Sequence, residues 1–149
     1  MTARAVLALA ALLAVAPAAR VAATVPLSQL RSYQDASTVE LTTTGRKSGA
    51  PRTVTIWFVI DEQGHLYVQS GKGGGTDWYR NLLQTPAVTL RIGELAMRGV
   101  AAPIDDAAET ARVHELFRQK YLRARLSGWF GGEVGHGRVV QLGELNQLS

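Results

Sequence analysis

The 149-residue chain contains no cysteine. This absence excludes disulfide bonds, a thiolate nucleophile and any metal site that needs cysteine ligands. Histidine is scarce as well, because only His65, His114 and His136 are present and they stand far apart in the sequence. Since they lack the spacing of a metal site, we expect no metal centre. No internal repeat is visible, and the length predicts a single domain.

Lysine is also rare, since 13 of the 16 basic residues are arginine and the net charge is +4. Arginine is suited to bidentate recognition of phosphates and carboxylates. The cations are dispersed, without the dense basic run or the interleaved aromatic residues that are typical of a nucleic-acid interface. We therefore expect a small-molecule partner and no nucleic acid.

The long apolar run of this sequence lies at its N-terminus. Residues 5–16 form a 12-residue apolar run after a short basic start, and small residues follow through Ala23. This layout is typical of a signal peptide over residues 1–23, and the run is shorter than the roughly 20 residues of a membrane span. Without a twin-arginine pair, it predicts Sec-type export of residues 24–149 as a periplasmic or secreted domain with no membrane span. An uncleaved anchor and a misassigned start codon, which would leave a cytoplasmic protein, are the alternatives.

Residues 42–52 read Thr-Thr-Thr-Gly-Arg-Lys-Ser-Gly-Ala-Pro-Arg. Gly45 and Gly49 let the backbone turn tightly and approach a ligand closely. Three cations and several hydroxyl groups in this run supply donors suited to a phosphate or a carboxylate. A solvated basic hairpin turn has the same composition, so the residues alone leave both interpretations open.

A second glycine-rich segment, residues 69–82, reads Gln-Ser-Gly-Lys-Gly-Gly-Gly-Thr-Asp-Trp-Tyr-Arg-Asn-Leu. Its glycines lie between the end of an expected strand and the start of an expected helix, with Thr76 or Asp77 as the N-cap. A helix N-terminus presents free N–H groups to an anion or to the edge of an electron-rich ring. The spacing matches neither a Walker A loop nor a dinucleotide fingerprint, and a plain surface loop is the alternative.

Hydrophobic periodicity predicts an α+β domain. One long helix is expected over residues 107–125, and its apolar face contains Ala111, Leu116, Phe117 and Tyr121. We interpret the acidic residues at its start as charges of the N-terminal turn rather than acid–base residues; they are Asp105, Asp106 and Glu109. A short helix is expected over 77–83, and residues 26–35 are either a helix or an extended lead-in. Six strands, about residues 39–43, 53–60, 65–70, 87–92, 95–104 and 138–142, predict a small antiparallel barrel with flanking helices.

The order of these motifs resembles the deazaflavin-dependent nitroreductase family, a branch of the split β-barrel flavin and deazaflavin oxidoreductases. The shared pattern is Thr-Thr-Gly-Arg-Lys-Ser-Gly-x-Pro-Arg, a hydrophobic hairpin, Ser-x-x-Gly-Gly, Asp-Trp-Tyr-x-Asn-Leu and Thr-Pro-Ala-Val-Thr-Leu. It covers residues 39–142 and is strongest over 41–90. The resemblance implies a split β-barrel that binds 8-hydroxy-5-deazaflavin (coenzyme F-420), with FMN as the alternative. It also implies hydride delivery to a quinone, a nitro compound or a conjugated enone.

The resemblance assigns cofactor-binding residues at three places. The tail of the cofactor is assigned to Arg46, Lys47, Ser48 and Arg52. Its ring system is assigned to Thr53, Val54 and Thr55 along one edge and to Ser70, Gly71 and Lys72 along the other, and Asn81 matches an Asn-Leu pair that supports the loop. The cofactor supplies the redox chemistry in such enzymes, so few catalytic side chains are expected.

The chain departs from the family pattern at two places. Gly75-Thr76 stands where family members carry His-Pro before Asp-Trp, and Tyr121, Trp129 and Phe130 do not clearly match the aromatic residues of the substrate side. No catalytic residue is therefore assigned. An exported FMN-, haem- or other ligand-binding protein without this redox activity is the alternative function. A homodimer also stays open, since split barrels often dimerise and nothing in the sequence marks an interface.

Overall fold

The computed structural model describes residues 23–126 and 137–149. The expected signal peptide, apart from Ala23, and Trp129 and Phe130 lie outside the described residues. Within the described part, no helix is long and apolar enough to cross a membrane.

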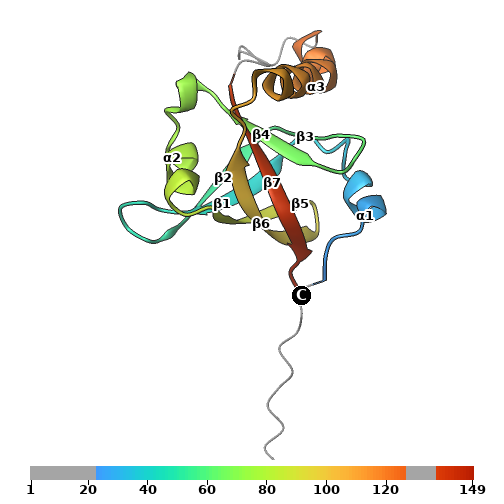
Figure 1. Cartoon of the computed structure of the whole chain (residues 1–149). Coiled ribbons are helices and arrows are strands. Elements are labelled where there is room, and N and C mark those ends of the chain that lie inside the picture. The colour runs from blue at the N-terminus through green and yellow to red at the C-terminus, as the bar shows by residue number, and fades with distance from the viewer. Residues whose placement is uncertain (1–22, 127–136) are drawn as a thin grey trace, which may run out of the picture.

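Seven antiparallel strands form one curled sheet in the order β2-β1-β5-β6-β7-β4-β3, which confirms the split-barrel prediction (Figure 1). The strands are β1 (Val39–Thr44), β2 (Pro51–Ile56), β3 (Phe58–Ile60), β4 (Leu66–Ser70), β5 (Ala87–Ile92), β6 (Leu95–Pro103) and β7 (Arg138–Gln147). The described helices are α1 (Leu27–Arg31), the 3₁₀ turn η1 (Lys72–Gly74), α2 (Asp77–Gln84) and α3 (Ala107–Leu126). β7 continues five residues beyond the expected end because its pairing with β6 goes on to Gln147, whereas its pairing with β4 ends at Leu142.

The expected single strand over residues 53–60 is wrong, because the chain breaks it at Trp57 into β2 and β3. These two strands form the opposite edges of the sheet. Trp57 stacks on Tyr121 of α3, with ring centroids 4.3 Å apart and an interplanar angle of 8°. The backbone N–H of Phe58 donates to the hydroxyl of Tyr121 over 3.0 Å. A helix contact therefore turns the chain from one edge of the sheet to the other, and the strand number becomes seven.

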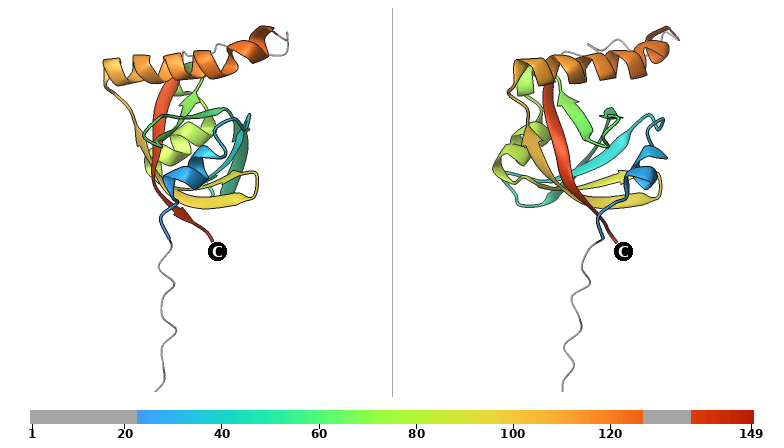
Figure 2. Two further views of the ribbon diagram at one scale, coloured as in Figure 1. Left: turned by 90° about the vertical axis from the view of Figure 1, so that its right-hand side faces the viewer. Right: turned by 45° about the vertical axis from the view of Figure 1, so that its right-hand side comes forward.

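Two apolar clusters fill the domain. The inside of the barrel holds Leu41, Phe58, Leu66, Leu90 and Met97, together with Trp78 and Leu82 from α2. Helix α3 lies across one end of the barrel (Figure 2) and buries a second cluster against β3, β4 and β7. That cluster uses Val113, Phe117 and Tyr121, which recur every four residues. The expected place of Ala111 on this apolar face is wrong, because Ala111 is exposed.

Lys120 adds a second contact between α3 and the crossover at Trp57, which joins β2 to β3. Its ammonium donates to the backbone carbonyl of Phe58 over 2.9 Å and lies 3.7 Å from the centroid of the Phe58 ring. Burial lowers the pKa of Lys120 to about 8. Lys120 and Tyr121 therefore hold the residue at which β3 begins from two sides.

We predict that Tyr121→Phe lowers the free energy of unfolding by about 1–3 kcal/mol, because it leaves the buried N–H of Phe58 without an acceptor. Urea unfolding followed by circular dichroism measures the change. Tyr33→Phe is the matched control, since Tyr33 is partly exposed and its hydroxyl forms no hydrogen bond within the described ranges. Equal stability of both variants would mean that the hydroxyl of Tyr121 does not hold the crossover.

Candidate functional site

A groove of about 630 Å³ lies between the turn that joins β1 to β2 and the helix α2. It is open to solvent along the β2 edge of the sheet, where α2 approaches β1. Its lining contains three cations, one carboxylate, an amide and a few apolar groups: Gly45, Arg46, Lys47, Ser48, Pro51, Arg52, Thr53, Val54, Asp77, Trp78 and Asn81. The structure thus brings the predicted tail residues and Asn81 into one hollow.

The turn over residues 45–50 is closed by its own hydrogen bonds. The N–H of Gly45 donates to the carbonyl of Ala50, and the N–H of Gly49 donates to the carbonyl of Gly45, both over 2.8 Å. A Cβ atom at Gly45 would lie 2.7 Å from Oγ of Ser48, and Gly49 has a φ of +70°. The positive φ therefore favours glycine at position 49, and a side chain at position 45 would crowd Ser48 and the carbonyl of Ala50. This local closure fixes the backbone that carries Arg46 and Lys47.

Asn81 joins this turn to α2 and to β1. The buried side chain of Asn81 accepts from the backbone N–H of Arg46 over 3.1 Å and from Nη1 of Arg46 over 3.0 Å. Its own Nδ2 donates to Oγ1 of Thr43 over 3.2 Å. Since a buried amide is stable only with its partners in place, these bonds set the position of the turn relative to the helix.

The three cations of the groove differ in what they contact. Nη2 of Arg46 lies 3.0 Å from Oδ1 of Asp77, so this guanidinium is already paired. The side chains of Lys47 and Arg52 are exposed, and neither side chain forms an ion pair or hydrogen bond with another described residue. Ser48 Oγ accepts from the N–H of Ala50, which leaves its O–H free to donate. The donors available to a ligand are therefore Lys47, Arg52 and Ser48.

Strand β2 forms the second wall of the groove. Residues opposite each other in the β1–β2 ladder share a face, and Val54 pairs with buried Leu41, whereas Thr53 pairs with Thr42. The hydroxyls of Thr42 and Thr53 lie 2.7 Å apart on the outer face, and Thr55 does not line the groove. Because β2 is an edge strand, alternate backbone groups point away from β1 and are free to meet a ligand.

The residues predicted along the other edge of the ring, Ser70, Gly71 and Lys72, do not line this groove. Ser70 is buried, and its Oγ lies 2.5 Å from Oγ1 of Thr76 and 3.2 Å from the carbonyl oxygen of Gly71. Lys72 is exposed with a φ of +54°. Thr76 is the N-cap of α2, yet its hydroxyl contacts Ser70 instead of the helix N–H groups. The groove that holds the predicted tail residues is therefore lined without Ser70, Gly71 and Lys72.

The sequence pattern did not assign Asp77 to the binding residues. Asp77 and Asn81 are four residues apart on α2 and therefore share a helix face, on which both contact Arg46. This spacing could have identified Asp77 once Asn81 was assigned. Trp78 belongs to the core, being only 7% exposed, and it also contributes to the lining of the groove.

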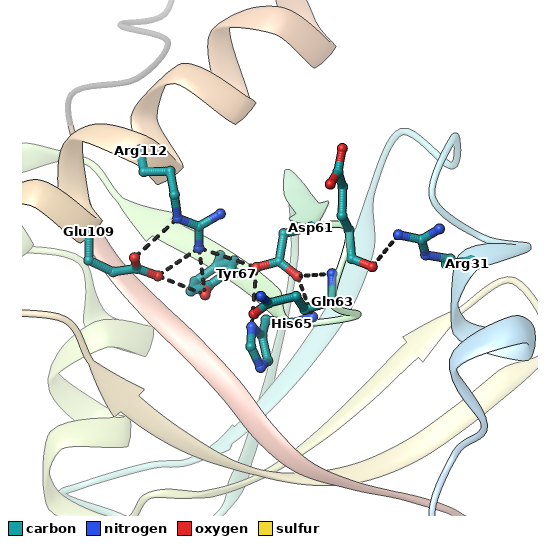
Figure 3. Close-up of polar contacts among 8 residues, drawn as sticks. Arg31, Asp61, Gln63, His65, Tyr67, Glu109 and Arg112 are labelled. Carbon is teal, nitrogen blue, oxygen red and sulfur yellow. Dashed lines mark hydrogen bonds and ion pairs between the residues drawn. The ribbon is translucent and has the colours of Figure 1, made fainter.

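A second cavity, of about 580 Å³, lies between α3 and the turn that joins β3 to β4. Figure 3 shows Asp61 within a cluster of polar side chains that line this cavity. The buried carboxylate of Asp61 accepts from Nη2 of Arg112 over 3.2 Å. It also accepts from the backbone N–H of His65 over 2.8 Å and lies 3.2 Å from the ring nitrogen Nδ1. Arg112 donates to Glu109 and to Tyr67, whose hydroxyl in turn donates to Glu109 over 2.9 Å. Sequence reasoning missed this cluster, since it treated Glu109 as a helix-turn charge.

The pKa shifts of the cluster follow from these contacts. Burial raises the pKa of Asp61, but the hydrogen bonds and charge of His65 and the bond from Arg112 outweigh it, so the net pKa lies below its ordinary value. Hydrogen bonds from Arg112 and Tyr67 lower the pKa of Glu109 to about 2. Burial and the bond to Glu109 raise the pKa of Tyr67 to about 12. The described residues contain no group of side chains that could hold a metal ion. The bonds of Arg112 and Glu109 to Asp61 and Tyr67 fasten the β3–β4 hairpin to α3.

We predict that Glu109→Gln reduces the acid sensitivity of the fold. A carboxyl whose pKa falls to about 2 in the folded state stabilises the fold above its ordinary value of 4.5, and this contribution is lost as the pH falls toward 2. The free energy of unfolding should therefore decrease less between pH 5 and pH 3 in Glu109→Gln than in the wild type. Glu115→Gln, in an exposed pair with Arg118 on the same helix, is the control. If the free energy of unfolding depends on pH in the same way in all three proteins, Glu109 does not have this role.

Residues 19–126 match the sequence model of the F420H(2)-dependent quinone reductase family. The match spans more than half of the chain, so the chain belongs to this family.

Solved structures agree with this assignment at the level of the fold. A structure described as an F420-H2 dependent reductase (FDR-A) is 23% identical with a TM-score of 0.52, and the match covers 71% of this chain and 93% of that one. A conserved hypothetical protein from Mycobacterium tuberculosis is 14% identical with a TM-score of 0.57, covering 87% and 83%. The heme storage protein HutZ of Vibrio cholerae is 17% identical with a TM-score of 0.52, covering 80% and 93%. At these identities, the likeness shows the split-barrel fold alone.

Proposed function

We propose that this protein is an oxidoreductase that uses reduced coenzyme F-420, a deazaflavin, to reduce a quinone, a nitro compound or a conjugated enone. The observation that carries the proposal is the groove beside α2, which gathers Arg46, Lys47 and Arg52 in a member of the F420H(2)-dependent quinone reductase family. The reduced deazaflavin supplies a hydride, and a quinone that takes up this hydride and one proton becomes a hydroquinone.

The residues of the groove fit the anionic tail of this cofactor. Lys47 and Arg52 are exposed cations, and Ser48 has a free O–H, so these three side chains can hold phosphate or carboxylate oxygens. Asn81 holds the turn that carries Lys47 and so positions these donors before a ligand arrives. A neutral ligand would leave the charges of both cations uncompensated.

The ring end of the cofactor is proposed to lie between the edge of β2 and the loop over residues 70–75. The free backbone groups of β2 around Val54 can bond the ring from one side. Backbone N–H groups of the glycine-rich loop can stabilise negative charge from the other side. Gly73 and Gly74 have φ values of +61° and +86°, so the shape of this loop depends on them. No described side chain is assigned as the proton donor.

We predict that the double variant Lys47→Ala/Arg52→Ala binds coenzyme F-420 at least tenfold more weakly, because two charge-assisted contacts are lost, each of about 1.5–3 kcal/mol. Titration of cofactor fluorescence measures the affinity. The control variant Arg91→Ala/Arg118→Ala removes two exposed arginines on β5 and α3 and keeps the wild-type affinity. Unchanged binding by the first variant would contradict the tail assignment, and binding of FMN in preference to coenzyme F-420 would favour the alternative ligand.

We predict that Gly73→Val lowers turnover with a quinone acceptor at saturating reduced cofactor, since valine is strained at a φ of +61° and would reshape the loop. A Cβ atom at Gly73 meets nothing within 4 Å, so the effect would come from the backbone conformation and not from a clash. Gly143→Ala, in β7 and also with open space around the new atom, is the control. If Gly73→Val turns over at the wild-type rate, the loop only connects β4 to α2 and does not bind the ring of the cofactor.

A further inference from the structure

Asp77 is the one acidic residue among the described residues that line the groove. Its side chain is 84% exposed, whereas that of its partner Arg46 is 21% exposed. An exposed carboxylate is normally dispensable for stability, because an ion pair in water contributes little. As the first residue of α2, Asp77 lies near the positive end of the helix dipole, and its charge also offsets part of the positive charge of the groove.

Arg46 does not depend on Asp77 alone for its position. Its Nη1 donates to Asn81 over 3.0 Å, and its backbone N–H donates to the same amide oxygen over 3.1 Å. Asn81 is buried and bonded to Thr43, so this anchor is rigid. Removing the charge of Asp77 would thus free Nη2 of Arg46 for a ligand without releasing the side chain from the groove.

We infer that Asp77 competes with the anionic tail of the cofactor for Arg46 and so limits how tightly the groove binds anions. This inference rests on the proposed function. With Asp77 ionised, three cations and one anion leave a charge of +2 in the groove. A ligand oxygen that approaches Arg46 must displace the carboxylate of Asp77, which lies 3.0 Å from Nη2 of Arg46. Until it is displaced, the negatively charged carboxylate repels the ligand oxygen. Each negative charge of the ligand near Asp77 adds to this repulsion.

The opposite role would be that Asp77 orients Arg46 for binding. The two roles predict changes of opposite sign. If Asp77 competes, Asp77→Asn strengthens anion binding, because one repulsive charge is lost. In a solvent-exposed site, the loss of one such charge corresponds to about a three- to tenfold gain in affinity. If Asp77 orients Arg46, the same variant weakens binding.

The experiment titrates the full-length wild type, Asp77→Asn and the control Asp105→Asn, an exposed aspartate just before α3. The probes are coenzyme F-420 and its tailless chromophore, followed by fluorescence. We expect Asp77→Asn to bind coenzyme F-420 three- to tenfold more tightly, with a steeper loss of affinity as salt is added, and to bind the tailless chromophore like the wild type. Asp105→Asn should match the wild type with both probes. Equal or weaker binding of coenzyme F-420 by Asp77→Asn, or an equal gain with the tailless chromophore, would overturn the inference.

Inorganic pyrophosphate, titrated by calorimetry, separates this inference from the proposed function. If the wild type binds neither deazaflavin, the proposed function is wrong. The titration with pyrophosphate then tests independently whether Asp77 competes with an anion for Arg46. Tighter binding of pyrophosphate by Asp77→Asn would support competition for Arg46. Equal or weaker binding would overturn it.

Discussion

The arrangement of this domain depends on the change of sheet edge at Trp57. Two consecutive strands, β2 and β3, form opposite edges of the sheet, and one residue separates them. The stacking of Trp57 on Tyr121 and the bond from Phe58 to the hydroxyl of Tyr121 hold this crossover from α3. The consequence for function is that β2 has a single ladder partner. Its outer edge is free, and the groove forms beside it.

The groove combines a rigid frame with free charges. Asn81 ties the turn, β1 and α2 together through buried hydrogen bonds, whereas Lys47 and Arg52 stay exposed beside this frame. Such a division suits the binding of an anionic tail. The frame is already ordered before the ligand binds, so binding does not have to order it. The long cationic side chains can then adapt to the positions of the ligand oxygens. Arg46 belongs to both parts, because it is held by Asn81 and paired with Asp77.

Local patterns in the sequence predicted much of the fold. The β5–β6 hairpin around Gly93, the helix α2 and the long helix α3 follow from turn residues and periodicity. The break at Trp57 could not be predicted, because residues 53–60 are uniformly strand-forming and the partner that breaks them is Tyr121. The Phe58–Tyr121 contact spans 63 positions. Tertiary packing, not local propensity, decided this element.

The candidate site shows the same division between local and distant information. The motif placed Arg46, Lys47, Ser48 and Arg52 together because they are neighbours in the chain. The pairing of Arg46 with Asp77 spans 31 positions, and its one local signal was the four-residue spacing of Asp77 and Asn81 on α2. The cluster around Asp61 likewise joins the β3–β4 turn to Arg112 across 51 positions, so each member looked ordinary by itself.

A crystal structure of the full chain with coenzyme F-420 tests the proposed binding site most directly. We predict that the anionic groups of the tail lie within hydrogen-bond distance of Lys47 and Arg52, in the groove between the β1–β2 turn and α2. A tail bound elsewhere, for instance in the cavity beside Asp61 and Arg112, would contradict it.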